Sequence, residues 1–600
     1  MSMGSSGSPA GVGDRAGGLR SDLGEVGQVR GLVILCSVVL AGVILGPALG
    51  RGVVLAYDLA WSPDARLTPF ATGITTPTPR AVPSDAFVWL LGAAITPSLA
   101  QKVVLAALLI GASLGAAALL REVRPVAGRW GLCAAALAAV WNPFVSERLV
   151  IGQWTVLLGY AVLPWAVRAA RRAVVGQTGS LPVALWLGVS GVGGVNSVLL
   201  VVLGVFAILL AGARRAPRRM IAHLCVATGA TLGISAAWMV PSLVAEIAVD
   251  SRSVAAFGPA PDTPLGVWGS LVSGGGFWNV AAHPAARDTV FVSVTAAALS
   301  LVAMGIYLVE VRRRNALELA APVIVGALVV VLSALPALRT MWEWLVTEVP
   351  GGGALRDSQK FLAPWMVAVA VGVGLVVDSL RRDRRPWGTP GAVVVIGSVV
   401  VLSSQLVWGV GGRLDAVRVP ADYRAAAAAL STMPPGEVGV LPWSQYRRYA
   451  WNGDRVSLTL APRMIDQRVL SDDSLPLRSG VISGESPRSA QVSEDIASGL
   501  TPVAALSRAG VRYLFVERGA GFEEDGTDEA AARAAGRVVA ETESVLLVEL
   551  PGGGFGAVQM PRANTVGWEI TLLTSVVLVT LGGVRVVRRR LPAGLLRSRP

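Results

Sequence analysis

Runs of apolar residues long enough to cross a lipid bilayer recur along most of the chain, and the charged residues are confined to the gaps between them. Because the hydrocarbon core of a bilayer is about 30 Å thick, a helix needs about 20 mostly apolar residues to span it. Hydrophobic residues make up 53% of the 600 residues, whereas charged residues make up only 15%. The sequence therefore predicts a mainly α-helical, polytopic transmembrane bundle rather than a string of soluble domains.

The expected bundle has about twelve spans, and its arginines set its orientation. Short cytoplasmic loops are enriched in basic residues, and every second gap between the apolar runs carries an arginine cluster. We therefore expect both termini to be cytoplasmic. The expected spans are Leu32–Leu49, Val103–Leu120, Trp130–Val145, Trp154–Val167, Leu181–Gly194, Val198–Leu210, Ile221–Val240, Val290–Leu308, Leu319–Leu335, Phe361–Val377, Ala392–Val410 and Trp568–Val584.

Composition changes along the chain indicate the division into domains. From Gly411 the hydropathy falls, and strand-like apolar runs alternate with helical patterns, which indicates a soluble α/β domain. The first thirty residues are rich in glycine and serine, which is typical of disorder. The expected regions are a disordered cytoplasmic N-terminus at 1–30, a bundle of about eleven spans at 31–410 with a long first outer loop at 50–102, an extracytoplasmic α/β domain at 411–565, the last span at 566–584 and a basic cytoplasmic tail at 585–600.

Within the α/β domain, the residue patterns are specific enough to predict individual elements. The expected strands are Val438–Leu441, Val511–Val516 and Val545–Leu550, and the expected helices lie near Tyr423–Leu430, before Val511 and near Glu529–Ala535.

The formal net charge of +13 could indicate nucleic-acid binding. However, the arginines follow the expected topology and do not line one face, so we expect no nucleic-acid partner. Cys36, Cys133 and Cys225 all fall within expected spans, where we expect small apolar core residues rather than disulfides or metal ligands. The two histidines lack zinc-binding spacing.

The first outer loop contains the leading candidate for an acid–base residue. Asp58 lies just beyond the first span, between the apolar runs VVLAY and LAW, and partial burial would suit its carboxylate to accept a proton. Its alternative role is a helix cap or a partner for Arg51 or Arg66. Further along the loop, Ser84 or Asp85 can begin a helix of about a dozen residues, which is too short to span and is expected to lie in the membrane interface.

Basic residues at the outer edge of the bundle suit a lipid phosphate. Arg148 lies beside Glu147 in the turn WNPFVSERLVIGQW, and Arg356, Asp357 and Lys360 precede the tenth span. A guanidinium can bind two phosphate oxygens at once. If a helix begins there, Asp357 and Lys360 can pair at i, i+3 and leave Arg356 for a ligand. The alternative is that Glu147 or Asp357 pairs with these bases, which would make the group structural.

Two outer segments contain side chains suited to hydroxyl groups or sugars. His283 lies in an outward loop and could contact a phosphate or a hydroxyl, although a surface histidine without such a role is the more frequent case. In the α/β domain, LPWSQYRRYAWN brings aromatic faces and arginines together, as a sugar site would need. The same aromatic side chains could instead dock the domain onto the membrane interface. They are Trp443, Tyr446, Tyr449 and Trp451.

The layout of the chain resembles the GT-C-type glycosyltransferases, which are integral membrane enzymes that use polyprenyl-phosphate sugars. An acidic residue in a long first outer loop, an interfacial helix after it, a multi-span bundle and a C-terminal outer domain carry the resemblance. The segments YDLAWSPDARLTPF, RAVPSDAFVWLL, WNPFVSERLVIGQW and LRDSQKFLAPW also resemble stretches in membrane proteins of actinobacteria, as does the bias toward Ala, Val, Gly and Arg.

The resemblance implies a reaction and a set of roles. Asp58 would be the base, with Asp64 and Asp85 as rivals because the first loop lacks the adjacent acidic pair of many members. Arg148, Arg356 and Lys360 would bind the donor phosphate. The expected supporting residues are Glu147, Asp357, Gln359 and His283, and the expected sugar contacts are the four aromatic side chains. No cofactor is expected, and a metal-dependent variant is not favoured.

The resemblance further implies the partners and the location. The donor would be a polyprenyl phosphate sugar such as arabinofuranose or mannose, and the acceptor a cell-envelope glycan or glycolipid on the outer face of the plasma (inner) membrane. Two other functions remain open at this point: a transporter or flippase of lipid-linked intermediates, and a non-catalytic factor for envelope assembly.

Overall fold

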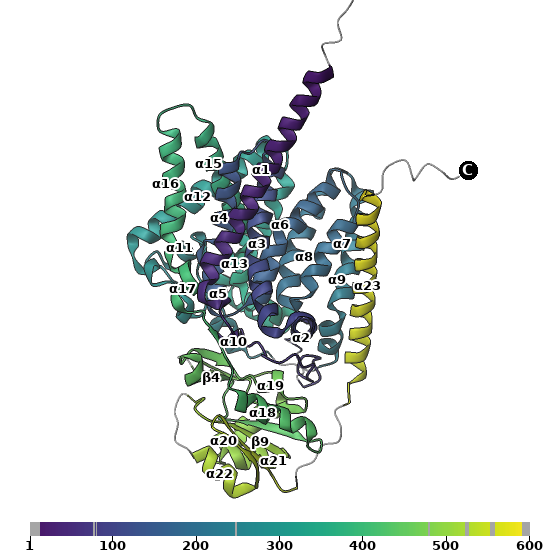
Figure 1. The fold of residues 1–600 in the computed structure, drawn as a ribbon, viewed down its shortest axis with the longest axis vertical. Coiled ribbons are helices and arrows are strands. Elements are labelled where there is room, and N and C mark those ends of the chain that lie inside the picture. Colours follow the sequence, from purple (N-terminus) through teal and green to yellow (C-terminus); the bar gives the residue numbers. More distant parts are fainter. Residues whose placement is uncertain are drawn as a thin grey trace, which may run out of the picture.

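The computed structural model describes residues 12–75, 79, 81–245, 249–477, 480–521, 527–552 and 559–590. A large helical bundle carries a small domain of strands and helices at one end (Figure 1). The first described helix is α1, Val12–Leu45, and the last is α23, Arg562–Arg590. The start of α1 and the end of α23 both lie at the end of the bundle opposite the strands (Figure 1).

The bundle helices form because their sequences are almost continuously apolar, and several begin with proline in the first turn, where its missing N–H is not needed. The other helices of the bundle are α3 Pro97–Val123, α4 Arg129–Val140, α5 Pro143–Val150, α6 Trp154–Val174, α7 Leu181–Gly191, α8 Gly194–Gly212, α9 Pro217–Val244, α12 Val290–Arg313, α13 Ala321–Ala334, α15 Ala363–Arg382, α16 Gly388–Leu402 and α17 Val407–Gly412. Shorter elements include α2 Ser84–Ile95, α10 Ser251–Ala256, α11 Gly266–Val272, α14 Arg339–Thr347 and the 3-10 helices η1 Gly46–Leu49, η6 Gly352–Leu355 and η7 Ser358–Leu362.

The described residues contain eight helices that are long and apolar enough to cross a membrane, or nine if the bent pair of α16 and α17 counts as one span. The prediction of a polytopic helical bundle is therefore confirmed, whereas the number of twelve spans is not reached. The difference lies in part at α4 and α7, which are helices at expected spans but have only 12 and 11 residues. At 1.5 Å per residue, α4 is about 18 Å long and falls short of a bilayer core.

Two expectations about the N-terminal part can be compared with the structure. α1 begins at Val12, inside the segment 1–30 that was expected to be disordered, and residues 1–11 lie outside the described part. An established helix extends cheaply, since each added residue contributes one hydrogen bond. The short helix in the first outer loop is present as α2, which runs from Ser84 to Ile95.

The small domain is built around a five-stranded mixed sheet of order β10-β11-β9-β3-β6. β3 is parallel to β6 and β9, whereas β11 is antiparallel to β9 and β10. Its strands are β3 Glu437–Leu441, β6 Arg468–Leu470, β9 Tyr513–Glu517, β10 Arg537–Glu541 and β11 Val545–Glu549, and its helices are α18 Ala421–Ala429, α19 Ala461–Met464, α20 Pro487–Ala497, α21 Pro502–Arg508 and α22 Thr527–Ala535. The three expected strands correspond to β3, β9 and β11, and the three expected helices to α18, α21 and α22.

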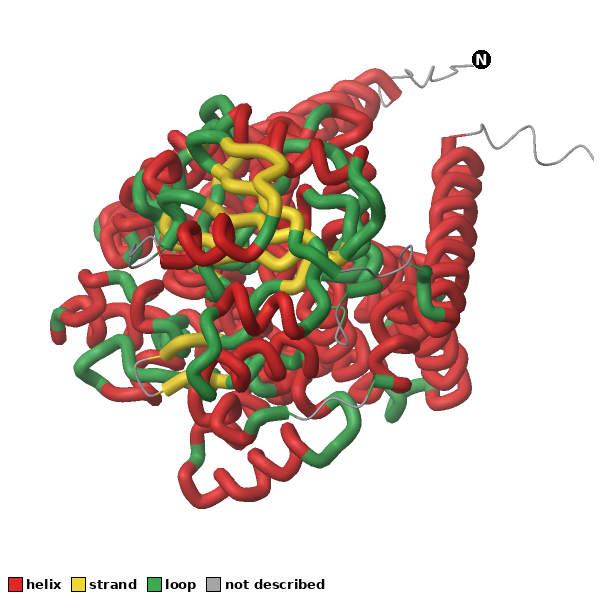
Figure 2. Tube along the Cα trace, turned by 90° about the horizontal axis from the view of Figure 1, so that it is seen from below, coloured by secondary structure: helices red, strands yellow, loops and turns green. Residues whose placement is uncertain are grey.

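Three two-stranded sheets connect the small domain to the bundle or project from it. They are β1 Val53–Val54 with β2 Ala416–Val417, β4 Tyr446–Arg448 with β5 Val456–Leu458, and β7 Leu475–Leu477 with β8 Gly480–Ile482. Figure 2, viewed from below, shows strands lying across the end of the helical bundle. Because β1 belongs to the first outer loop, the loop and the small domain are joined by backbone hydrogen bonds.

An unusual backbone conformation leads from the bundle into the small domain. Four successive residues, Trp408 to Gly411, have positive φ angles of 56°, 71°, 53° and 66°. Such left-handed backbone is costly for residues with a Cβ and easy for glycine. Two of the four are glycines, and a Cβ at Gly409 would lie 2.3 Å from the carbonyl oxygen of Leu414. Gly409 therefore permits the close turn that brings β2 against β1.

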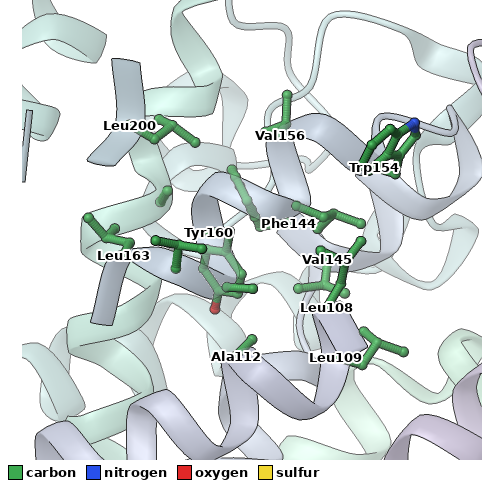
Figure 3. Close-up of a cluster of buried hydrophobic side chains, with 14 of the residues drawn as sticks. Leu108, Leu109, Ala112, Phe144, Val145, Trp154, Val156, Tyr160, Leu163 and Leu200 are labelled. Atoms are coloured by element: carbon green, nitrogen blue, oxygen red, sulfur yellow. The ribbon is translucent and has the colours of Figure 1, made fainter. Parts of the chain in front are cut away.

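The short helix α5 is anchored in the bundle by apolar packing (Figure 3). Its Phe144 and Val145 lie beside Leu108 from α3 and Tyr160 from α6, and all four side chains are buried. The Phe144 and Tyr160 rings are 5.3 Å apart between centroids. At its start, the Asn142 side chain accepts a hydrogen bond from the Val145 N–H, which caps the helix. The packing against α3 and α6 thus fixes the position of α5, which carries Glu147 and Arg148.

The arrangement predicts that the small domain and the two termini lie on opposite sides of the membrane. In a variant lacking the three native cysteines, a membrane-impermeant maleimide added to intact cells should label Ala497→Cys on exposed α20. The same reagent should label Val587→Cys, near the end of α23, only after permeabilisation. Labelling of Val587→Cys, but not of Ala497→Cys, in intact cells would reverse the predicted orientation.

Candidate active site

Asp58 lies at the end of the bundle next to the small domain, in a loop that is hydrogen-bonded on two sides. Its backbone N–H donates to the carbonyl of Ile151 at 3.0 Å, just after α5. The preceding residue, Tyr57, donates to the carbonyl of Val456 at 2.7 Å and accepts from the N–H of Leu458 at 2.9 Å. Tyr57 has a φ of 45°, which non-glycine residues rarely adopt. The bonds to β5 thus hold a strained residue directly before the candidate base.

The turn after α5 approaches this loop closely. A Cβ at Gly152, whose φ is 74°, would lie 2.3 Å from the backbone nitrogen of Leu59 and 2.4 Å from the carbonyl oxygen of Ala56. The next residue, Gln153, donates from Nε2 to Oδ2 of Asp58 at 3.4 Å. A residue larger than glycine at 152 would therefore push the turn away from the loop and separate Gln153 from Asp58.

Arg148 is the centre of a buried hydrogen-bonded network. Its side chain is fully buried and donates to Oδ2 of Asp357 at 2.7 Å and to Oδ1 at 3.3 Å. It also donates to the side-chain oxygens of Gln153 and Gln359. The guanidinium lies over the Phe277 ring, 4.3 Å from its centroid. Arg148 therefore links Gln153, which contacts Asp58, to the segment that precedes α15.

Glu147 lies next to this network in a second buried group. It is fully buried, and Gln359 donates from Nε2 to its Oε2 at 3.4 Å and to the carbonyl of Gly275 at 3.1 Å. Burial raises the pKa of the Glu147 carboxyl well above its usual range, and the negative charge of Asp262 raises it further. Asp262 is itself paired with buried Arg287 at 2.6 Å. Burial therefore favours the neutral form of the Glu147 carboxyl.

The two other predicted phosphate ligands also lie near Arg148. Lys360 is buried and donates to Oδ1 of Asn196 at 3.0 Å and to the carbonyl of Ala354 at 2.8 Å. The charges that act on it come from Asp357, Arg148 and Arg356. Arg356 lies over the Phe257 ring and forms an ion pair of 3.4 Å with Glu485 of the small domain. The three cations are therefore close enough for the charges of Arg148 and Arg356 to act on Lys360.

Of the two arrangements that the sequence left open, the structure contains the link between Asp357 and the basic residues: Asp357 bonds to Arg148. Lys360 donates to Asn196 and Ala354, and Arg356 pairs with Glu485. Asp357 precedes η7, and the buried Lys360 side chain extends toward α8, where Oδ1 of Asn196 accepts a hydrogen bond from it. The two side chains are thus held by different partners across the site.

The rival bases occupy other contacts of the first loop. Asp64 pairs with Arg424 of α18, and Asp85, at the start of α2, pairs with Arg463 at 2.8 Å. Burial raises the pKa of the Asp85 carboxyl, whereas Arg463 acts in the opposite direction. Both carboxylates tie the loop to the small domain through arginine partners, and this favours structural roles for them.

The remaining candidates are divided between the site and the domain core. His283 Nε2 donates to the carbonyl of Phe277 at 2.6 Å, next to the ring that stacks on Arg148. Tyr446 donates from its hydroxyl to Oδ1 of Asp58 at 3.3 Å. Trp443 instead donates to Ser493 at 3.0 Å. The other two aromatic side chains stack on each other with centroids 4.5 Å apart, and they are Tyr449, which is buried, and Trp451.

Several residues of the network did not stand out in the sequence. Gln153 lies in the quoted segment WNPFVSERLVIGQW, so its neighbourhood was identified but not its role. No local sequence signal marked Asn196 or Glu485. The described residues contain no group of three or more His, Cys, Asp or Glu side chains that could hold a metal ion.

Comparison with known proteins identifies structures that share the fold of this chain. No family model matches the chain, and no curated protein matches it. The cryo-EM structure of arabinofuranosyltransferase AftD from Mycobacteria aligns with a TM-score of 0.56 at 13% identity, over 87% of this chain and 40% of AftD. A mutant of the same enzyme aligns with a TM-score of 0.55 at 14% identity, over 88% of this chain and 42% of the other.

A weaker likeness is found to ArnT from Cupriavidus metallidurans bound to undecaprenyl phosphate, with a TM-score of 0.40 at 13% identity over 90% and 99% of the two chains. The AftD match shows that this chain has the GT-C glycosyltransferase fold that the sequence resemblance implied. The chain spans about two fifths of the length of AftD.

The raised pKa of the Glu147 carboxyl predicts a pH-dependent effect of Glu147→Gln. A carboxyl whose pKa is raised on folding stabilises the folded state below its unfolded pKa, and this contribution is lost as the pH rises toward the folded value. Glutamine keeps the shape without titrating. Thermal unfolding in detergent should therefore show a larger gain for Glu147→Gln over wild type at about pH 8 than at about pH 5. An equal difference at both pH values, as expected for the exposed control Glu543→Gln, would contradict the raised pKa of Glu147.

Proposed function

We propose that this protein is a membrane glycosyltransferase that moves a sugar from a polyprenyl phosphate to an acceptor hydroxyl. The observation that carries the proposal is the connection of Asp58, through Gln153, to Arg148 and the neighbouring cations within a GT-C fold. A carboxylate close to several cations suits a reaction in which a hydroxyl loses a proton while a phosphate leaves.

In the proposed reaction, Asp58 accepts the proton of the acceptor hydroxyl as its oxygen attacks the anomeric carbon. The bond between that carbon and the phosphate oxygen breaks, and the polyprenyl phosphate leaves with the bonding electron pair. A single displacement of this kind inverts the configuration at the anomeric carbon. Gln153 and Tyr446 contact different oxygens of the Asp58 carboxylate, which fixes its orientation toward the acceptor.

The three predicted phosphate ligands differ in their access to a ligand. The Arg356 side chain is 21% exposed, whereas that of Arg148 is fully buried. Lys360 is buried as well. We therefore propose that Arg356 contacts the donor phosphate, in competition with Glu485. The two buried cations then supply positive potential behind it, and Arg148 also positions the network around Asp58.

The finer identity of the substrates follows by analogy. AftD is an arabinofuranosyltransferase, and four segments of the sequence resemble stretches in membrane proteins of actinobacteria. We propose arabinofuranose or mannose as the sugar and an envelope glycan or glycolipid as the acceptor. The protein would be a multi-pass protein of the plasma membrane, with the small domain and the site on the extracytoplasmic face.

Asp58→Asn is expected to lower turnover by about 100-fold or more, since it preserves the shape of the side chain but removes the base. The assay supplies membranes containing the full-length protein with a panel of polyprenyl phosphate sugars and envelope acceptors. Asp64→Asn is the matched control, because Asp64 pairs with Arg424 at the surface, and it should retain turnover.

Equal membrane levels and thermal stability of the two variants make the comparison valid. Full turnover by Asp58→Asn would reject Asp58 as the base. No turnover by wild type with any donor would favour a transporter or a non-catalytic assembly factor.

A further inference from the structure

We propose that the small domain contributes directly to the active site through Tyr446, which acts as a positioning residue for the Asp58 carboxylate. This inference rests on the proposed function of Asp58. The sequence pattern had placed Tyr446 among four aromatic candidates for sugar stacking. Its hydroxyl instead donates to Oδ1 of Asp58 at 3.3 Å, across 388 residues of sequence.

The first argument is the backbone connection between the two segments. β4 and β5 form an antiparallel hairpin, and Tyr57 forms a bridge with Ser457 on β5. Hydrogen bonds of Tyr57 to Val456 and Leu458 join the loop that carries Asp58 to the edge of this hairpin. The side chain of Asn452 adds a bond to the carbonyl of Leu55 at 3.3 Å. The residue before the candidate base is therefore attached to the small domain through an isolated β-bridge.

The second argument is that the core of the small domain fixes the position of Tyr446. Successive residues of a strand point to opposite sides, and on β4 the middle residue Arg447 is fully buried while Tyr446 is half-buried. Arg447 forms an ion pair with buried Glu517. Glu517 also accepts from the hydroxyls of Tyr423 at 2.5 Å and Tyr449 at 2.7 Å. Because a buried charge is costly unless all its partners are in place, this cluster holds β4 in one position.

The third argument concerns the carboxylate itself. Gln153 contacts Oδ2 from the bundle side and Tyr446 contacts Oδ1 from the small domain, so the two donors hold opposite oxygens. The Tyr446 ring also meets the Tyr57 ring edge to face, with centroids 6.1 Å apart. Two donors from independent elements restrict rotation of the carboxylate and favour its ionised form.

Tyr446→Phe is the decisive variant, since it removes the hydroxyl and keeps the ring. We expect kcat to fall about tenfold, as for the loss of one hydrogen bond to a charged group. KM for donor and acceptor should stay near wild type. The acid limb of the pH profile of kcat should also move to higher pH, because the ionised carboxylate loses a donor.

Tyr513→Phe is the matched control. It removes a hydroxyl that donates to the carbonyl of Pro434 at 2.9 Å in the small domain and does not belong to the cluster around Glu517, so it should lower thermal stability while leaving the acid limb of the pH profile at its wild-type position. A shift of the acid limb in Tyr446→Phe but not in Tyr513→Phe would separate positioning from a general loss of structure.

The possible outcomes separate this inference from the proposed function. If Asp58→Asn is inactive while Tyr446→Phe has wild-type kcat and pH profile, only the positioning role is overturned. A raised KM with unchanged kcat in Tyr446→Phe would also overturn it and would favour a sugar contact. If Asp58→Asn is fully active, the proposed function fails whatever Tyr446→Phe does.

A measurement without substrate tests the contact itself. In a double-mutant cycle of Asp58→Asn and Tyr446→Phe, thermal unfolding of the full-length protein should show non-additive effects, as for residues in direct contact. Additive effects would overturn the inference even where no donor supports turnover.

Discussion

The buried guanidinium of Arg148 is the interaction on which the rest of the candidate site depends. A buried charge is costly unless it is paired, and removal of one partner leaves the other charge uncompensated. The two terminal nitrogens of Arg148 bond to Asp357, Gln153 and Gln359, which come from two separate parts of the chain. The apolar anchoring of α5 fixes one side of this network, and the segment before α15 provides the other. Asp58 is oriented because Gln153 belongs to the same network.

The position of Asp58 depends further on contacts made by a domain nearly four hundred residues away. The strained backbone of Tyr57 is maintained by β5, and the close approach of the turn at Gly152 brings Gln153 within reach. The small domain also pairs with Arg356 through Glu485, and with Asp64 and Asp85 through arginines. The first outer loop is thus held between the bundle and the small domain, and this fixes the position of Asp58.

Local sequence patterns predicted the elements of this structure well where one physical rule dominates. Continuous apolar runs predicted the long helices, and β3, β9 and β11 are buried strands with apolar sequences at the expected places. The twelve-span count is not confirmed, in part because α4 and α7 have only 12 and 11 residues, and apolar composition does not reveal where a helix ends. Clustering of Asp58, Arg148 and the residues before α15 could be expected, since all were assigned to the outer side. The partners of these residues could not be predicted. The pairs Arg148–Asp357, Arg356–Glu485 and Tyr446–Asp58 depend on tertiary packing between distant segments, which no local sequence pattern records.

The most direct test of this account is a cryo-EM structure of the full-length protein with a non-transferable polyprenyl phosphate sugar. The account predicts that the donor phosphate contacts Arg356 in place of Glu485, with Arg148 and Asp357 still paired. It also predicts that the anomeric carbon faces the Asp58 carboxylate, leaving space for an acceptor hydroxyl between them. A donor bound with its phosphate away from Arg356 and Lys360, or with its sugar on a side of the bundle that Asp58 cannot reach, would contradict it.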